Sequence, residues 1–332
     1  MERTKTGVIG AGLLGKQHAR MYQELPDALL LGIYDSNHEK AQKIAKEVGI
    51  IAFENLDDLI NEVDAFSIAI PTVSHFSVAQ KILEKGKHVL IEKPLAATEE
   101  EAQKLISLAN EKGCKIQVGH VERYNSGIKA LEDIPVKPVY VEAQRLAPFS
   151  SDSEKTDVVM DLMLNDIDLL QFFVQSTPLH ISANSASVIS SGIDIVNARI
   201  EYENGCVASL TASRIARKKV NKMRMYQQNQ QITIDYVEGV SEIFYLSEEG
   251  QGPFHDGTLA ISLGKIRDRD IKYNRLQRDQ IVPLRGALRN FIVGIRNNLP
   301  MIPSADEGLE ALKIARKIMA EINTQKQKLN EY

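Results

Sequence analysis

The sequence predicts an α/β protein of two domains: a parallel, doubly wound sheet, then an α+β domain with a large, mostly antiparallel open sheet. Strand and helix patterns alternate through about the first 120 residues, which is typical of βαβ units. After about Tyr124 one apolar helix is followed by several strand-like segments. We therefore expect domains at 1–123 and 124–332, with a C-terminal helix that is able to pack back on the first domain.

Short apolar segments separated by amphipathic ones define the first domain. The expected strands are Thr6–Ile9, Leu29–Tyr34, Ala65–Ile70, His88–Ile91 and Lys115–Val118. The expected helices are Leu14–Glu24, Glu39–Val48, Leu56–Ile60, Ser74–Lys85 and Glu99–Lys112. Thr98 and Glu101 have the spacing of a capping box, which marks the start of the last helix.

The second domain begins with a helix over Val158–Val174. Its expected strands include His180–Ser187, Ile195–Tyr202, Cys206–Ser213, Met223–Gln228, Gln231–Tyr236 and Ser241–Leu246. Asp268–Asp279 is dense in charge and is expected to be a mobile loop. Leu284–Asn297 and Asp306–Gln327 are expected to be helices.

Composition excludes several classes of protein. With 43% hydrophobic and 25% charged residues and a net charge of -4, the chain predicts a globular protein without attraction for nucleic acid or an anionic membrane. No apolar run has the length of a membrane span, and the N-terminus does not resemble a signal peptide, so we expect a cytoplasmic protein. Cys114 and Cys206 show no metal-ligand spacing, and no metal is expected. His18 is isolated and is expected to be structural or exposed.

A glycine-rich turn joins the first strand to the first helix. Gly10-Ala11-Gly12-Leu13-Leu14-Gly15 matches G-x-G-x-x-G, the Rossmann dinucleotide fingerprint, in which glycines let the pyrophosphate approach backbone N–H groups. Asp35 closes the second strand about 20 residues later, where a carboxylate accepts hydrogen bonds from ribose hydroxyls. This favours NAD over NADP. Two alternatives remain: a turn without a ligand, and a 2′-phosphate tolerated by Ser36, Asn37 and His38.

A second motif lies farther along the first domain. Ile70-Pro71-Thr72, His75 and the run Gly86–Leu95, which contains Glu92-Lys93-Pro94, resemble the glucose–fructose oxidoreductase / inositol dehydrogenase / MocA (Gfo/Idh/MocA) family. The resemblance covers nearly the whole chain. It implies that Pro71, Thr72 and His75 lie near the cofactor, that Glu92 binds the ribose beside the nicotinamide, and that the Lys93–Pro94 peptide is often cis.

Lys93 is the expected catalytic residue. The resemblance places it between the nicotinamide and the substrate hydroxyl. A lysine at the C-terminal edge of a parallel sheet lies where ligands bind, so it can take or relay the hydroxyl proton as hydride leaves. The alternative is an ordinary surface lysine after a strand.

The helix over Val158–Val174 carries polar residues on an apolar background. Asp161, Asn165 and Asp168 are spaced to share one helical face, which we expect to face a cleft and hold the substrate. The alternative is a helix-dipole role for Asp161 and a structural ion pair for Asp168. Family members usually have a histidine where this chain has Asn165. An amide has no useful pKa and cannot act as an acid or a base, so Asn165 can only orient a sugar hydroxyl. Lys93 then has to take a larger part in the proton transfer, through Asp161 or a water, with His120 a weaker substitute.

The local sequence favours one branch of the family. Arg145–Pro148, Val158–Met163 and Ala212–Arg214 resemble the UDP-N-acetylglucosamine 3-dehydrogenase / WlbA-type branch, so Arg145 and Arg214 are expected to bind pyrophosphate or a sugar carboxylate. Arg123 and Tyr124 are also expected to contact the substrate. The basic run that follows has the same possible role, although a solvated strand edge explains its lysines as well; it comprises Arg217, Lys218, Lys219, Lys222 and Arg224.

Together these features predict an NAD-dependent oxidoreductase that oxidises a sugar hydroxyl, with a nucleotide-activated amino sugar such as a UDP-N-acetylhexosamine as substrate. The resemblance also implies a homodimer or homotetramer. Two other functions stay open. One is an NAD-binding sensor or regulatory relative with weakened catalysis, and the other is a dehydrogenase or reductase of a free polyol, imine or other carbonyl substrate.

Overall fold

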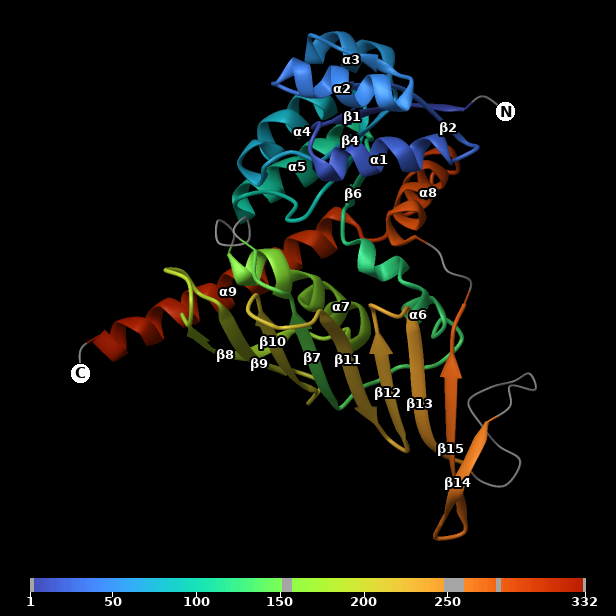
Figure 1. Ribbon diagram of the computed structural model, residues 1–332, viewed down its shortest axis with the longest axis vertical. Helices are drawn as coiled ribbons and strands as arrows, with labels where there is room; N and C mark the ends of the chain where they lie inside the picture. Colours follow the sequence, from blue (N-terminus) through green and yellow to red (C-terminus); the bar gives the residue numbers. More distant parts are fainter. Residues whose placement is uncertain (1–2, 151–156, 248–259, 279–281, 331–332) are drawn as a thin grey trace. The chain divides into compact units, whose positions relative to one another are not determined.

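The computed structural model describes residues 3–150, 157–247, 260–278 and 282–330 (Figure 1). The chain forms two compact units. The first contains Met1–Tyr124 with Val282–Lys313, and the second contains Asn125–Ile281 with Ile314–Tyr332. Where the sequence suggested one boundary at 123/124, the first unit also includes a late segment of the chain. None of the helices in the described ranges is long and apolar enough to cross a bilayer.

The first unit is built on a six-stranded sheet in the order β3-β2-β1-β4-β5-β6, and every neighbouring pair is parallel. Its strands are β1 (Thr4–Ile9), β2 (Ala28–Tyr34), β3 (Ile51–Ala52), β4 (Ala65–Ile68), β5 (His88–Ile91) and β6 (Ile116–Val118). Its helices are α1 (Leu13–Gln23), α2 (His38–Val48), α3 (Leu56–Glu62), α4 (His75–Glu84), α5 (Glu99–Lys112) and α8 (Pro283–Arg296), with the 3-10 turns η1 (Thr72–Ser74) and η2 (Val121–Tyr124). This order confirms the predicted doubly wound fold and reverses direction between β1 and β4, where ligands bind in such sheets.

Helix α8 belongs to this unit because its apolar face completes the core. Leu288 and Phe291 are fully buried and pack in the same cluster as Tyr22 of α1 and Ile33 of β2. A contact between segments so distant in the chain leaves no mark in local periodicity. The predicted capping box is present, since Thr98 accepts from the Glu101 backbone N–H and the Glu101 side chain accepts from that of Thr98.

The second unit is built on a nine-stranded sheet in the order β14-β15-β13-β12-β11-β7-β10-β9-β8. Its strands are β7 (Tyr140–Leu146), β8 (Pro178–Ala186), β9 (Ile195–Tyr202), β10 (Val207–Ser213), β11 (Val220–Gln227), β12 (Gln230–Asp235), β13 (Val240–Ser247), β14 (Ile261–Ile266) and β15 (Arg269–Leu276). All pairs are antiparallel except β7 with β10. The predicted second sheet is therefore confirmed.

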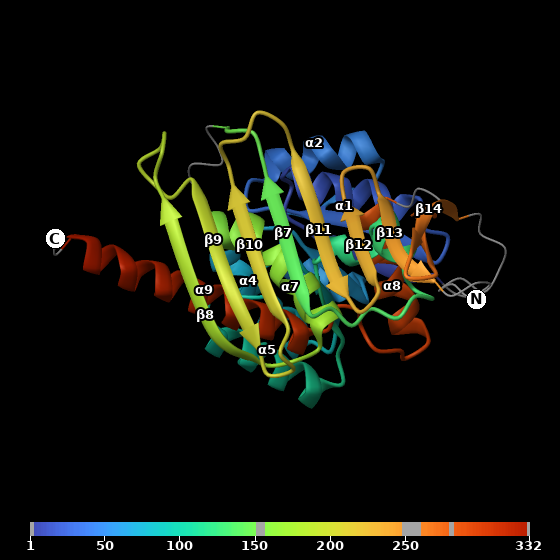
Figure 2. The same cartoon turned by 90° about the horizontal axis from the view of Figure 1, so that it is seen from below.

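Helices cover one face of this sheet. They are α6 (Ser126–Lys129), the π-helical turn η4 (Val159–Met163), α7 (Leu164–Val174) and the later part of α9 (Ala305–Asn330). Figure 2 looks onto the opposite face, where the strands run in front of α7 and α9.

One expectation for this unit was wrong. Within the described residues, 268–279 is mainly a strand rather than a loop, because Arg269–Leu276 pairs with β13 and β14. Arg267 and Asp268 have positive φ angles of 48° and 63° and form the tight turn between β14 and β15. The charged residues at the start of this segment therefore belong to a hairpin turn. Asp279 lies outside the described residues.

Tyr140–Leu146 was not among the strands named from the sequence. It forms β7, near the middle of the sheet. Buried Val141, Ala143 and Arg145 alternate with the more exposed Glu142 and Gln144, and the charged Arg145 at a buried position interrupts the apolar pattern of the strand.

Candidate functional site

Gly10, Gly12 and Gly15 of the first turn have different structural roles. Gly10 has a φ of 104°, and a Cβ there would lie 2.2 Å from the Ala69 carbonyl oxygen of the chain after β4. A Cβ on Gly15 would lie 1.8 Å from the Gly10 carbonyl oxygen, so only glycine lets α1 start this close to β1. Gly12 caps α1, and a Cβ there would meet nothing within 4 Å. The first and third glycines thus shape the turn, and the second leaves open space at the helix N-terminus.

That open space suits an anion. The first turn of α1 contains no acidic residue, and its N-cap has no side-chain hydrogen bond. The N–H groups at the start of a helix attract phosphate, which fits the dinucleotide expected here. Leu13 and Leu14 follow at 76% and 47% exposure, and so leave the entrance open.

Asp35 follows β2 directly and faces the glycine turn. One carboxylate oxygen accepts from the Ala11 backbone N–H at 2.6 Å, and the other accepts from Asn37 N–H at 2.8 Å. These bonds orient the carboxylate, and each oxygen keeps a lone pair for a ribose hydroxyl.

His75 joins two of the predicted cofactor segments. Its ring nitrogens lie 2.9 Å from the carbonyl oxygens of Ile70 and Pro94, and the side chain is 1% exposed. The imidazole therefore holds the turn after β4, which carries Pro71 and Thr72, against the Glu-Lys-Pro turn. Within the site, His75 therefore has a structural role.

The Glu-Lys-Pro turn follows β5. The Lys93–Pro94 peptide is cis, as the resemblance implied. Lys93 is partly exposed at the C-terminal edge of the sheet. Pro71, Thr72, Glu92 and Lys93 thus come together at the ends of the neighbouring strands β4 and β5.

Glu92 is buried at 8% exposure and pairs with His18 of α1, whose Nε2 lies 2.9 Å from Oε1. Burial alone would raise the pKa of the Glu92 carboxyl, but the hydrogen bond and charge of His18, with the nearby Lys93, hold it below its usual range. Sequence reasoning missed His18. Its signal was its position three residues after Gly15, on the face of α1 toward the sheet.

The polar residues of the second unit lie on η4 and the start of α7. Asp161 is exposed, Asn165 is half-buried and Asp168 is 0% exposed. These three side chains therefore differ in exposure instead of forming one exposed stripe. A π-helical turn over Val159–Met163 precedes α7, so the regular α-helical spacing behind the predicted shared face does not hold across this segment. Such turns are frequent at functional sites. The Asn165 amide lies 3.3 Å from the Asp161 carbonyl oxygen.

Arg145 and Arg214 are each held by a buried carboxylate. Arg145 donates to both oxygens of Asp166 at 2.9 and 2.8 Å, and both side chains are at most 5% exposed. Arg214 pairs with Asp194 at 3.2 Å, also buried. The Ser190 hydroxyl, helped by backbone N–H groups of 188–190, holds the pKa of Asp194 well below its usual range. These guanidiniums support the sheet, and their geometry gives no exposed face to a pyrophosphate.

We therefore expect Arg145→Met to act on stability. Removing one partner leaves Asp166 buried and uncompensated, which costs about 3–5 kcal/mol of unfolding free energy. Urea unfolding measures this loss, and the double variant Arg145→Met/Asp166→Leu should recover much of it. Unchanged stability with a selectively raised KM for the sugar would show instead that Arg145 binds substrate.

Arg123 and Tyr124 have partners in the first unit. The Arg123 guanidinium donates to Glu307 near the start of α9, and the Tyr124 hydroxyl donates to the Ile302 carbonyl. Burial raises the pKa of Glu307, but Arg123 and Ser304 outweigh it and hold that pKa below its usual value. Both residues secure the 302–307 segment.

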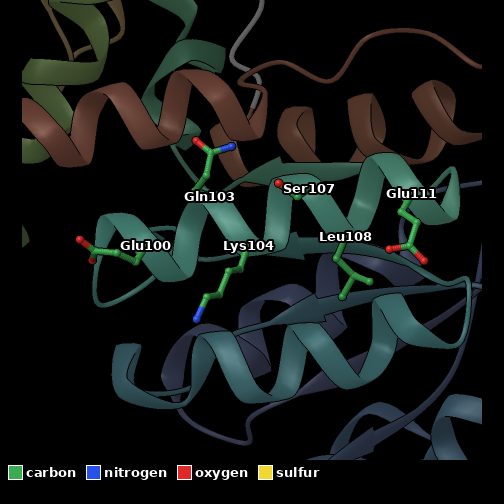
Figure 3. A pocket seen from close by; sticks show the side chains of 6 residues that line it. All are labelled: Glu100, Gln103, Lys104, Ser107, Leu108 and Glu111. Atoms are coloured by element: carbon green, nitrogen blue, oxygen red, sulfur yellow. The ribbon is translucent and has the colours of Figure 1, made fainter.

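One hollow in the described part of the molecule is formed along α5 (Figure 3). It measures about 520 Å³ and is lined by Glu100, Gln103, Lys104, Ser107, Leu108 and Glu111. None of these belongs to the predicted site. Across the described ranges, no group of three or more His, Cys, Asp or Glu side chains is placed to hold a metal ion.

Comparison with known proteins adds independent information. Residues 4–120 match the model of the GFO_IDH_MocA oxidoreductase family, described as an NAD-binding Rossmann fold. A UDP-N-acetylglucosamine 3-dehydrogenase from Acidithiobacillus ferrooxidans is 37% identical over 246 residues, which is 74% of this chain and 78% of that protein. An inositol 2-dehydrogenase from Rhizobium meliloti is 22% identical over 325 residues, which is 93% of this chain and 94% of that protein.

A solved structure shows the same similarity. The UDP-N-acetylglucosamine 3-dehydrogenase GnnA from Acidithiobacillus ferrooxidans superposes with a TM-score of 0.85 at 32% identity, covering 98% of this chain and 99% of that one.

Proposed function

Because the chain belongs to the Gfo/Idh/MocA family of oxidoreductases, we propose that it oxidises a hydroxyl of a nucleotide-activated amino sugar, such as a UDP-N-acetylhexosamine, with NAD as hydride acceptor. The observation that carries this proposal is the 37% identity to a UDP-N-acetylglucosamine 3-dehydrogenase over 74% of the chain. The joint presence of the glycine turn and the Glu-Lys-Pro turn at the ends of β1 and β5 supports it.

The first unit serves as the dinucleotide domain in this proposal. The pyrophosphate would lie at the N-terminus of α1 beside Gly12, and Asp35 would accept hydrogen bonds from the hydroxyls of the adenosine ribose. A 2′-phosphate would meet the Asp35 carboxylate, so NAD is preferred to NADP. Glu92 would accept a hydrogen bond from the ribose beside the nicotinamide. Bound NAD supplies the hydride acceptor, while the protein supplies orientation and proton handling.

Lys93 handles the proton of the reacting hydroxyl. Its Nζ accepts or relays that proton as the carbon becomes a ketone. In the second unit, the exposed Asp161 and the half-buried Asn165 are the candidates for binding the sugar. We assign a structural role to the five other predicted substrate residues, because their side chains are buried. They are Arg123, Tyr124, Arg145, Asp168 and Arg214.

The direct test is incubation with NAD or NADP and a panel of UDP-sugars, free sugars and polyols, followed by the absorbance of reduced cofactor. We expect turnover with a UDP-N-acetylhexosamine and NAD. Turnover confined to a free polyol would overturn the choice of substrate. Tight NAD binding with no turnover of any compound would favour the second candidate, a sensor, which the amide at Asn165 supports.

Replacing Asn165 by histidine separates an active catalyst from a weakened one. If Lys93 carries the proton, Asn165→His should leave kcat within about a factor of three. A gain of about a hundredfold, within the usual contribution of a general base, would show that the natural chain lacks its proton acceptor. The matched control is Gln175→His, at the C-cap of the same helix α7.

Cytoplasmic location and assembly into a homodimer or homotetramer remain predictions. Size-exclusion chromatography with light scattering tests the assembly.

A further inference from the structure

His18 and Glu92 connect the first helix to the turn that carries Lys93, although 74 residues separate them in the sequence. The His18 side chain is 0% exposed, and the Glu92 side chain is 11% exposed. Nε2 donates to Oε1 over 2.9 Å, because a carboxylate in this pair can only accept. The pair therefore sits inside the domain, with Glu92 next to the predicted catalytic lysine.

The fold alone does not require an imidazole at this position. The second ring nitrogen, Nδ1, is buried and has no hydrogen-bond partner among the residues that the structure describes. A buried polar atom without a partner destabilises a protein, so an apolar side chain would serve packing better. What His18 provides is the single bond to Glu92.

Glu92 is confined on its other side as well. A Cβ on Gly119 would lie 2.8 Å from Oε2, so this oxygen rests against the backbone that follows β6. The carboxylate is held between α1 and β6 in one orientation. The titratable groups that act on its charge are His18 from α1 and Lys93 from its own turn, and together they outweigh the effect of burial on the pKa of Glu92.

We propose that His18 is a positioning residue, which holds the Glu92 carboxylate ionised and aimed at the ribose beside the nicotinamide. The proposal rests on the proposed function, which assigns that ribose to Glu92. His18 touches neither cofactor nor substrate and acts through Glu92.

The test measures NAD binding by calorimetry without substrate. His18→Leu removes the donor, and His18→Gln keeps an amide donor of similar reach. We expect the Kd for NAD to rise about tenfold in His18→Leu, the loss of one hydrogen bond to a charged group, and to stay within about threefold in His18→Gln.

The pH dependence of binding is the second readout. An ionised Glu92 is required, so affinity is complete above its pKa and falls as the pH drops through it. Wild-type affinity should be level from about pH 7 down to about pH 5, because the pKa of Glu92 lies below its usual range. Without His18, burial raises that pKa, and the loss of affinity should begin at higher pH.

Tyr22→Phe is the matched control. Tyr22 lies one turn later on α1, is fully buried, and makes one hydrogen bond, 2.8 Å to the Ser67 hydroxyl. The Tyr22→Phe variant should have a lower melting temperature, and its NAD binding and the pH profile of that binding should be unchanged. If His18→Leu behaves in the same way, His18 is only structural and the proposal is overturned.

Two further outcomes are distinguishable. Should His18→Leu fail to fold, His18→Asn, whose amide is too short to reach Oε1, replaces it under the same criteria. Wild-type NAD binding without turnover of any sugar overturns the proposed function and leaves the binding comparison readable. Absence of NAD binding by the wild type overturns both.

Discussion

Lys93→Met should lower kcat about a thousandfold for the sugar substrate, because the hydroxyl proton then has no acceptor, and general acid–base groups contribute roughly 10²–10⁴. The side chain keeps its length and loses its amine. The Kd for NAD should stay within about a factor of three, since the pyrophosphate and ribose contacts are elsewhere. Steady-state kinetics and NAD calorimetry on the same preparation give both values.

Lys85→Met is the control for this variant. Lys85 is an exposed lysine at the C-cap of α4, in the same domain. It should behave as the wild type in both measurements. If Lys93→Met keeps its turnover, another group takes the proton, and Asp161 is the first to test.

Gly15→Ala should destabilise the first domain by at least about 3 kcal/mol, the upper part of the range for overpacked sites. The new methyl group would lie 1.8 Å from the Gly10 carbonyl oxygen, and neither residue can move away easily because α1 and β1 hold their backbone in place. Chemical unfolding measures the loss, and NAD binding should fail with it.

Gly12→Ala is the matched variant at the same turn. Its φ of -82° suits alanine and a Cβ there meets nothing, so stability should change by less than about 1 kcal/mol. The methyl group would stand where the pyrophosphate approaches, and the Kd for NAD should rise at least about tenfold. If Gly12→Ala binds NAD normally, the turn does not hold a dinucleotide in the proposed way.

Local patterns in the sequence predicted much of this protein. Strand β9 was expected at Ile195–Tyr202 and α5 at Glu99–Lys112, the ranges that the structure shows. Their alternation, periodicity and capping depend on neighbours within a few residues, which the sequence displays directly. The glycine turn and the Glu-Lys-Pro turn are equally local, and their spacing was sufficient to predict the family and the cofactor domain.

Tertiary structure decided which side chains are available to a ligand. Arg145 and Arg214 resembled anion-binding residues until Asp166 and Asp194 were found beside them. His18 resembled an isolated histidine until β5 brought Glu92 within 2.9 Å. The role of a charged side chain depends on the partner that folding brings next to it, and these partners lie 20 to 74 residues away in the sequence. The sequence by itself thus determined the elements and the dinucleotide turn, whereas long-range packing decided which polar residues support the fold and which are left for chemistry.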